Sequence, residues 1–219
     1  MKRFFDSEFF YNYRKSFSAV FGSVIIFLAL VIGLIGPFVV PQNPYDQKQT
    51  DLSNAYLPPM WEEEGRAEFP LGTDGQGRDM LSVIVYGSRI SLLIGISVTV
   101  ISCVIGTFLG VFAGYKGGKT DSFIMRVADI QLSFPSMLIA LFIMAIFGSG
   151  IEKLIVTLSF VGWVMFARTI RGETLSVKNQ EYIQAAHVLG YSDWRILFRH
   201  VLPNVTTPLI VLFTNKIGN

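Results

Sequence analysis

Four long apolar runs, separated by polar segments, dominate the pattern of this chain. They cover residues 17–40, 91–115, 123–147 and 154–167. Crossing a bilayer core about 30 Å thick takes roughly 20 residues of apolar helix. The first three runs are long enough, and the fourth reaches that length only if flanking residues contribute to it. The pattern therefore predicts an all-α polytopic membrane protein.

Positive residues around the apolar runs predict the orientation of the chain. With four crossings and residues 1–16 as a cytoplasmic tail, eleven lysines and arginines lie on the inner side and five on the outer side. The inner set is Lys2, Arg3, Arg14, Lys15, Lys116, Lys119, Arg168, Arg171, Lys178, Arg195 and Arg199. The outer set is Lys48, Arg66, Arg78, Arg89 and Lys153. Cytoplasmic segments carry an excess of these residues, so we expect the N-terminus inside and residues 41–90 outside.

The outer segment 41–90 is acidic and rich in proline and glycine. This composition is typical of a series of turns rather than of an independent domain, and it fits either a solvated cap or a docking surface. Residues 80–89 are the exception, because their pattern predicts a short amphipathic helix lying on the membrane.

Composition supports a membrane protein without catalytic chemistry of its own. The chain is 51% hydrophobic and 16% charged, against about 25% charged residues in soluble domains. A net charge of +2 without a basic run gives no sign of nucleic-acid binding. Cys103 is the only cysteine, which excludes a disulfide framework. The stretch 113–120, AGYKGGKT, departs from a phosphate-binding loop because Ala113 replaces the first glycine and an apolar run precedes it. We therefore expect no cofactor and no enzymatic activity.

Small residues recur every four positions in the second apolar run. They are Ser102, Gly106, Gly110 and Gly114. On a helix they form one smooth stripe that a neighbouring helix can approach closely. The stripe predicts helix packing, either within the chain or against another subunit.

Two ionisable residues, Arg126 and Asp129, lie in the third run and share one helical face. Ionisable residues inside a span are often functional, which makes these two candidates for a proton or substrate site. They also lie within two turns of the expected cytoplasmic end. There a local ion pair, with side chains that reach the headgroups, suffices to explain them.

Residues 181–204, EYIQAAHVLGYSDWRILFRHVLPN, are too polar for a span and too regular for a loop. One predicted helical face is formed by Tyr182, Ala185, Ala186 and Leu189, and a second by Trp194, Leu197, Phe198 and Val201. Asn179 and Ser192 stand where N-caps are expected, and Gly190 stands where a residue in the left-handed conformation is expected to end the first helix. Pro203 ends the second helix. We call this predicted pair of short helices the elbow.

Two helices this short are marginal in water on their own, so their apolar faces need a groove. The groove can lie between the ends of the spans or on a soluble partner. Arg195 and Arg199, one turn apart, suit an acidic rim or lipid headgroups. Periodicity alone leaves partner docking and membrane-surface packing equally open.

The elbow resembles the cytoplasmic EAA loop of ABC importer permeases. The pattern of that loop is Glu-Ala-Ala, three residues, Gly, nine residues, then Ile-x-Leu-Pro. The matching positions here are Gln184, Ala185, Ala186, Gly190, His200, Leu202 and Pro203, with Gln184 in place of the glutamate and His200 in place of the isoleucine. Segments 69–92, 167–190 and 199–204 are similar to permeases of the dipeptide, oligopeptide and nickel importers.

The resemblance implies an ABC importer permease fold with six spans in a bacterial inner membrane, surrounded by lipid. It implies a homologous permease as partner, two ATPase subunits and an extracytoplasmic solute-binding protein. The substrate would be a peptide, a nickel chelate or a similar small solute. The elbow would seat in a cleft of one ATPase, and the coupling residues implied are Glu181, Gln184, Ala185, Ala186, Gly190, Trp194, Arg195, Leu202 and Pro203.

Residues 91–219 are expected to form the permease core, with the coupling loop at 176–204. The last apolar run, 205–213, is too short to cross a bilayer. We therefore expect the chain to hold about four to five of the six spans and to be incomplete at its C-terminus. Two other interpretations remain open: a secondary transporter or channel that uses Arg126 and Asp129, and a membrane scaffold without transport. ATP hydrolysis by a co-purifying partner distinguishes them from an ABC importer.

Overall fold

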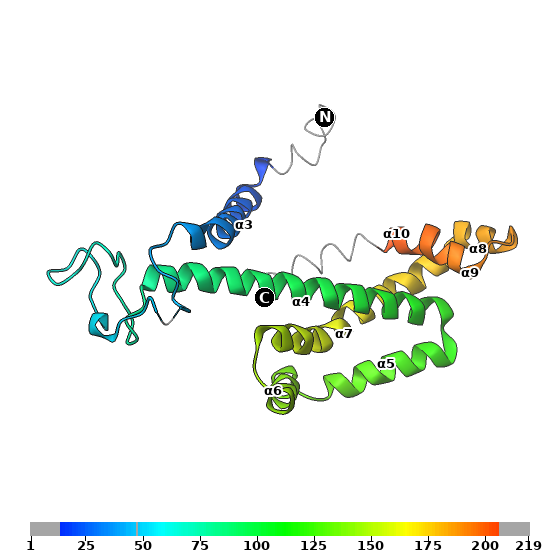
Figure 1. The fold of residues 1–219 in the computed structure, drawn as a ribbon. Coiled ribbons are helices and arrows are strands. Elements are labelled where there is room, and N and C mark those ends of the chain that lie inside the picture. Colours follow the sequence, from blue (N-terminus) through cyan, green and yellow to red (C-terminus); the bar gives the residue numbers. More distant parts are fainter. Residues whose placement is uncertain (1–13, 47, 206–219) are drawn as a thin grey trace. The chain divides into compact units, whose positions relative to one another are not determined.

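The structure is a computed structural model that describes residues 14–46 and 48–205. Most of the expected tail (1–16) and of the last apolar run (205–213) lies outside these residues. The described residues form helices and no strand, which confirms the all-α class. The helices are α3 (Phe17–Ile35), α4 (Met80–Lys116), α5 (Gly118–Leu132), α6 (Ser136–Phe147), α7 (Ile151–Lys178), α8 (Glu181–Val188), α9 (Asp193–Ile196) and α10 (Leu202–Asn204), with the short segments η1 (Gly36–Phe38), η2 (Leu52–Asn54) and the π-helical η3 (Leu197–Val201) (Figure 1).

Three stretches are long and apolar enough to cross a membrane: α3 with η1, α4, and α7. α5 and α6 meet the same criterion only as a pair, with a bend of 87° between them, and give a fourth pass if the pair is one broken span. The chain divides into two compact units, Met1–Leu93 and Ile94–Asn219.

In the first unit, two glycines let α3 and η1 lie close to the beginning of α4. A Cβ added at Gly33 would lie 2.7 Å from Leu92 Cδ1, and one added at Gly36 would lie 2.5 Å from Val85 Cγ1. Both distances are shorter than ordinary van der Waals contact, so a Cβ at either position would require the Leu92 or Val85 side chain to move.

The segment before α4 is a series of turns held by two carboxylates. Asp74 accepts hydrogen bonds from the backbone N–H groups of Gln76 (2.8 Å) and Arg78 (3.1 Å), and forms an ion pair with the Arg78 guanidinium (2.7 Å). Partial burial raises the pKa of Asp74, but the bonds from Arg78 and Gln76 outweigh it and leave this pKa below its usual value. Asp79 then caps α4, since its Oδ2 accepts from the Ser82 N–H at 2.7 Å.

The separate amphipathic helix expected at residues 80–89 is wrong, because these residues form the first turns of α4. The stretch contains no proline, and Gly87 is its only glycine. A single glycine lowers helix stability without ending the helix, so the backbone continues into the second apolar run. The resulting 37 residues of α4 exceed the roughly 20 that a bilayer core requires.

The third apolar run is not one straight helix, as the pattern predicted, but divides into α5 and α6. Pro135 lies at the break; it has no N–H to donate and disfavours helical backbone at the residue before it. Ser133 completes the end of α5, because its backbone N–H and its hydroxyl both donate to the Asp129 carbonyl, at 3.1 and 2.9 Å. Pro135 is visible in the sequence, but the predicted span 123–147 included it as part of one helix.

The small-residue stripe of α4 lies against α7 within the chain. The pairs that meet are Ser102 with Ser159, Gly106 with Trp163, Gly110 with Ala167, and Gly114 with Thr174. The Ser102 hydroxyl donates to the Ser159 carbonyl at 3.2 Å. A Cβ added at Gly110 would lie 2.5 Å from the Ala167 carbonyl oxygen. The two backbones are therefore in direct contact along this stripe.

These pairs advance in the same direction along both helices, so α4 and α7 are parallel. Their C-terminal ends lie on one side, and residues 117–150 must carry the chain back between them. α5 and α6 make this return together, which accounts for four passes even though the pair is bent.

Near its C-terminal end, α5 is fastened to α7 by the Gln131 side chain and by a hydrophobic core. The Gln131 amide donates to the carbonyls of Phe160 (3.1 Å) and Val161 (3.0 Å), and its Oε1 accepts from Trp163 Nε1 at 3.0 Å. The core beside this contact consists of Ala113, Ile124, Ala128, Trp163, Val164 and Ala167. The C-terminal half of α4, α5 and α7 thus form one packed group.

Candidate functional site

The elbow follows α7 directly and has two arms joined by a turn at Gly190 (Figure 1). The first arm is α8, and the second begins with α9 and continues through η3 and α10. Gly190 has φ +78°, the left-handed conformation predicted for it. Its N–H donates to the His187 carbonyl (2.9 Å), and the Tyr191 N–H donates to the Ala186 carbonyl (3.1 Å). These two bonds make a Schellman motif, so the turn has a defined geometry.

One of the two predicted N-caps is confirmed and the other is wrong. Ser192 takes the N-cap position of α9, as expected. Asn179 does not cap α8, because it is the C-cap of α7, and Gln180 stands at the start of α8. The long helix α7 continues further than the apolar pattern indicated, which moves the first arm by one residue.

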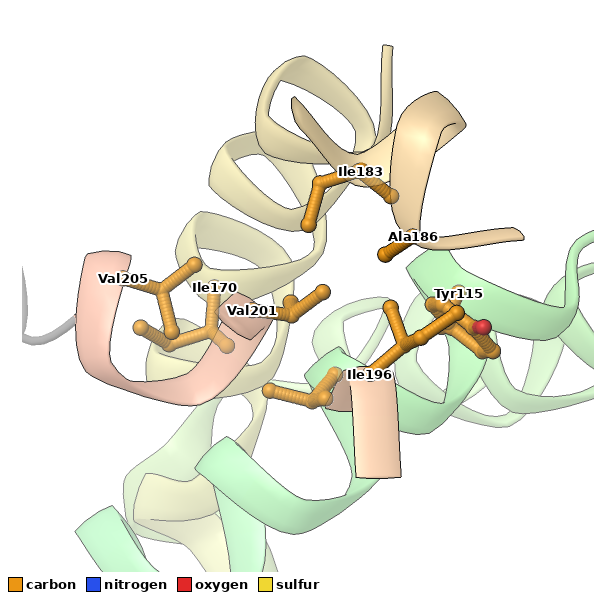
Figure 2. Close-up of a cluster of buried hydrophobic side chains, with 8 residues drawn as sticks. Tyr115, Ile170, Ile183, Ala186, Ile196, Val201 and Val205 are labelled. Atoms are coloured by element: carbon orange, nitrogen blue, oxygen red, sulfur yellow. The ribbon is translucent and has the colours of Figure 1, made fainter. Parts of the chain in front are cut away.

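A hydrophobic cluster joins both arms of the elbow to α4 and α7. Its members are Val111 and Tyr115 of α4, Ile170 of α7, Ile183 and Ala186 of α8, Ile196 of α9, Val201 of η3, and Val205. All of them are buried, and the side chains labelled in Figure 2 converge in the space between the helices. Burying one isoleucine side chain contributes about 1.5–3 kcal/mol, and three isoleucines take part. The elbow is therefore held on the chain's own helices.

The buried face of α8 differs from the predicted one. Ile183 and Ala186 are buried, whereas Tyr182 and Leu189 are exposed. The prediction grouped Ala186 with the exposed residues because apolar side chains occur on both sides of α8, and eight residues are too few to separate two faces. Ala186 is thus a core residue of the elbow rather than part of its outer surface.

The buried face of the second arm also differs from the predicted one, but for another reason. Ile196 and Val201 share its buried face although they are five residues apart, while Trp194 and Phe198 remain more than half exposed. The intervening η3 is a π-helix, in which residues five apart stand above one another. The predicted face assumed the α-helical repeat throughout, so only Val201 of its members is buried.

Most of the expected coupling residues lie on the surface. The exposed ones are Glu181, Gln184, Ala185, Gly190, Trp194, Arg195 and Pro203. Leu202 is half-buried. The most exposed apolar side chains of the elbow stand at its apex, beside the glycine turn: Val188 is 88% exposed and Leu189 71%. The apex is therefore an apolar surface that none of the described residues covers, on a fixed support.

Aromatic side chains of the second arm pack on one another. Trp194 stacks on Phe198 with ring centroids 5.7 Å apart, and the Arg195 guanidinium lies 5.1 Å from the centre of the Tyr191 ring. An apolar cavity of about 320 Å³ separates Trp194 and Phe198 from the part of α4 around Cys103. The Arg195–Tyr191 contact is a cation–π interaction, so the Arg195 guanidinium already has a partner within the elbow.

A polar cluster at the base of the elbow was not predicted. The Tyr115 hydroxyl donates to Asp193 Oδ1 at 2.9 Å and lies 3.4 Å from His187 Nε2. Lys178, at the end of α7, donates to the Tyr115 carbonyl at 2.5 Å. Tyr115 at the end of an apolar run was the available signal, but its partners are 72 and 78 residues away.

The expected ion pair between Arg126 and Asp129 is not the one found, because Asp129 pairs with Arg168 of α7. Arg171 of α7 likewise holds Asp121 of α5 through two bonds, Nε to Oδ1 at 2.5 Å and Nη2 to Oδ2 at 2.6 Å. Both pairs join α5 to α7, and the side chains of Arg168 and Asp129 are 47% and 63% exposed. Helical spacing within one run could not reveal a cation on a neighbouring helix.

In the part of the chain that the structure describes, no group of three or more His, Cys, Asp or Glu residues could hold a metal ion.

Two family models match the sequence. Residues 106–219 match the binding-protein-dependent transport system inner membrane component, and residues 7–59 match the N-terminal TM domain of oligopeptide transport permease C. The first match contains the three glycines of the stripe, α7 and the whole elbow.

Several curated relatives are similar over almost the whole chain. The dipeptide transport system permease protein DppC of Haemophilus influenzae is 34% identical over 97% of this chain and 71% of its own length. The di/tripeptide permease DppC of Pseudomonas aeruginosa is 37% identical over 94% and 67%. The oligopeptide permease OppC of Bacillus subtilis is 35% identical over 93% and 64%. The chain thus spans between 64% and 71% of the length of these relatives. Together with the packed helices and the seated elbow, these matches show that the chain belongs to the family of inner-membrane permease components of binding-protein-dependent transport systems.

Proposed function

We propose that this chain is a permease subunit of an ABC importer for peptides and that the apex of the elbow couples it to an ATPase subunit. The relatives are named as dipeptide, di/tripeptide and oligopeptide permeases, which supports a peptide as the substrate class. The proposed assembly contains a homologous permease, two ATPase subunits and an extracytoplasmic solute-binding protein. In this assembly the N-terminus and the elbow are cytoplasmic.

One observation carries the coupling role: the elbow is rigidly seated on the chain but leaves its apolar apex uncovered. The buried cluster ties both arms to α4 and α7, and those two helices touch along the glycine stripe. Closely packed elements move as bodies instead of deforming gradually. A force applied at Leu189 is therefore transmitted to two spans at once.

The proposal is tested by placing a charge on the apex. Leu189→Asp should reduce co-purification of the ATPase and ATP-driven uptake by roughly tenfold or more, because an unpaired charge is costly in an apolar interface. Thermal stability should stay unchanged, since the Leu189 side chain is largely exposed. Lys119→Ala is the matched control: it makes the same change in net charge at an exposed position at the start of α5. Wild-type uptake and ATPase binding by Leu189→Asp would overturn the proposal.

The rival is a secondary transporter or channel that uses Arg126 and Asp129, and no observation favours it. Asp129 pairs with Arg168 of α7, a contact that joins α5 to α7. Uptake that is driven by an ion gradient and persists without an ATPase would restore it.

A further inference from the structure

Tyr115 is the point at which four helices meet. It is the penultimate residue of α4, its ring belongs to the buried cluster, and its side chain is only slightly exposed. Its hydroxyl reaches Asp193, the first residue of α9, and His187, near the end of α8. Its carbonyl accepts from Lys178, the last residue of α7. One residue thus contacts both arms of the elbow and the end of the parallel helix.

The hydrogen-bond roles follow from counting protons. Tyr115 has one hydroxyl proton, and an ionised Asp193 carboxylate can only accept, so this proton points to Asp193 at 2.9 Å. The hydroxyl oxygen then has free lone pairs, and the contact with His187 at 3.4 Å requires Nε2 to carry the hydrogen. The two rings lie nearly parallel, with centroids 6.2 Å apart. The hydroxyl therefore bridges the end of α8 and the beginning of α9.

The backbone at the end of α4 is held as well. The Lys178 ammonium donates to the Tyr115 carbonyl at 2.5 Å and lies 5.5 Å from the centre of the Tyr115 ring. A cation at the C-terminus of a helix also interacts favourably with the helix dipole. Lys178 lies outside the predicted elbow faces, and its sequence position gave no reason to expect a role. In the structure it fastens the C-terminal end of α7 to that of α4.

We propose that Tyr115 is a positioning residue that fixes the angle of the elbow on α4 and α7, so that movement of the apex is transmitted to the spans. The buried cluster holds the elbow against α4 and α7, but apolar contact has no preferred direction, whereas a hydrogen bond has one. The Tyr115–Asp193 bond is directional and crosses from the span to the second arm. This inference rests on the proposed coupling function.

The first experiment measures the angle directly and does not depend on transport. Spin labels are placed on Val188→Cys and Lys119→Cys, both exposed, in a Cys103→Ser background of the permease in its complex. The distance distribution between them should be narrow in the parent and clearly broader in Tyr115→Phe, which removes only the hydroxyl. An unchanged distribution in Tyr115→Phe would overturn the proposal.

The second experiment measures peptide taken up per ATP hydrolysed by the reconstituted importer. Tyr115→Phe should lower this ratio roughly tenfold, the shift expected when a hydrogen bond to a charged acceptor is lost, while the ATPase still co-purifies. Asp193→Ala should match it, and the double variant should be no worse than either single one. Asp193→Asn keeps an acceptor oxygen and should largely rescue the ratio.

The outcomes separate this inference from the proposed function. If the parent itself shows no uptake that depends on ATP and on the binding protein, the proposed function fails. If the parent transports normally and Tyr115→Phe transports with the same ratio, only the positioning role fails. Equal damage by Asp193→Asn and Asp193→Ala would also contradict it, because the charge of Asp193 rather than its bond to Tyr115 would then be decisive.

Discussion

Gly110→Ala should force α4 and α7 apart, because the added Cβ meets backbone atoms that cannot rotate away. It would lie 2.5 Å from the Ala167 carbonyl oxygen and 3.1 Å from both the Ala167 Cα and the Arg171 N. Ordinary contacts begin near 3.5 Å, so one helix must shift by roughly 1 Å. A gap of that size removes about a quarter to a half of the dispersion energy at neighbouring contacts. Overpacking of this kind costs about 1–3 kcal/mol.

The matched control is Gly95→Ala on the same helix, where the added Cβ would have no neighbour within 4 Å. Both variants gain about 1 kcal/mol of helix propensity, so the difference between them isolates the clash. The assay is thermal unfolding of the purified protein in detergent. Gly110→Ala should unfold several degrees below Gly95→Ala, at about 2–4 °C per kcal/mol for a chain of this size. Equal unfolding temperatures would refute the close α4–α7 contact.

Three further predictions follow from other parts of the structure. Gly190→Val should destabilise the elbow by roughly 1 kcal/mol or more, because a side chain is strained at the positive φ of this position. ATP-driven uptake should then be abolished while membrane insertion stays normal. Gly172→Ala, in open space, should transport normally. Gln131→Leu should lower thermal stability by about 1–2 kcal/mol, since it leaves the Trp163 indole N–H without its acceptor; unchanged stability would argue against the bridge from α5 to α7. In intact cells, a membrane-impermeant thiol reagent should label single cysteines at 46–68 and spare those at 176–193, and the reverse pattern would invert the proposed orientation.

Local rules were sufficient where a few neighbouring residues determine the outcome. The four-residue repeat from Ser102 to Gly114 predicted a close helix contact, and the partner proved to be α7 of the same chain. Gly190 was assigned to a left-handed helix end from its position alone, and its φ of +78° agrees. In both cases the absence of a Cβ is the physical cause, and that is visible in the sequence.

The failures have different physical causes. The partner of Asp129 is 39 residues away and that of Tyr115 is 78 residues away, so no spacing rule within one helix could identify them. The buried face of the second arm follows a π-helical register, which an α-helical repeat misassigns. The break at Pro135 could have been foreseen, because proline disfavours helix at the residue before it.

The central claim is that the apex of the elbow touches the ATPase, and site-specific photo-crosslinking in the membrane complex tests it most directly. A photoreactive side chain replaces Leu189 at the apex, and, in separate variants, buried Ile183 of the same helix and exposed Lys119 at the start of α5. The account predicts an adduct with an ATPase subunit from position 189 and none from positions 183 and 119. If position 189 yields adducts only with lipid or with the permease itself, the elbow lies against the membrane and does not couple to the ATPase.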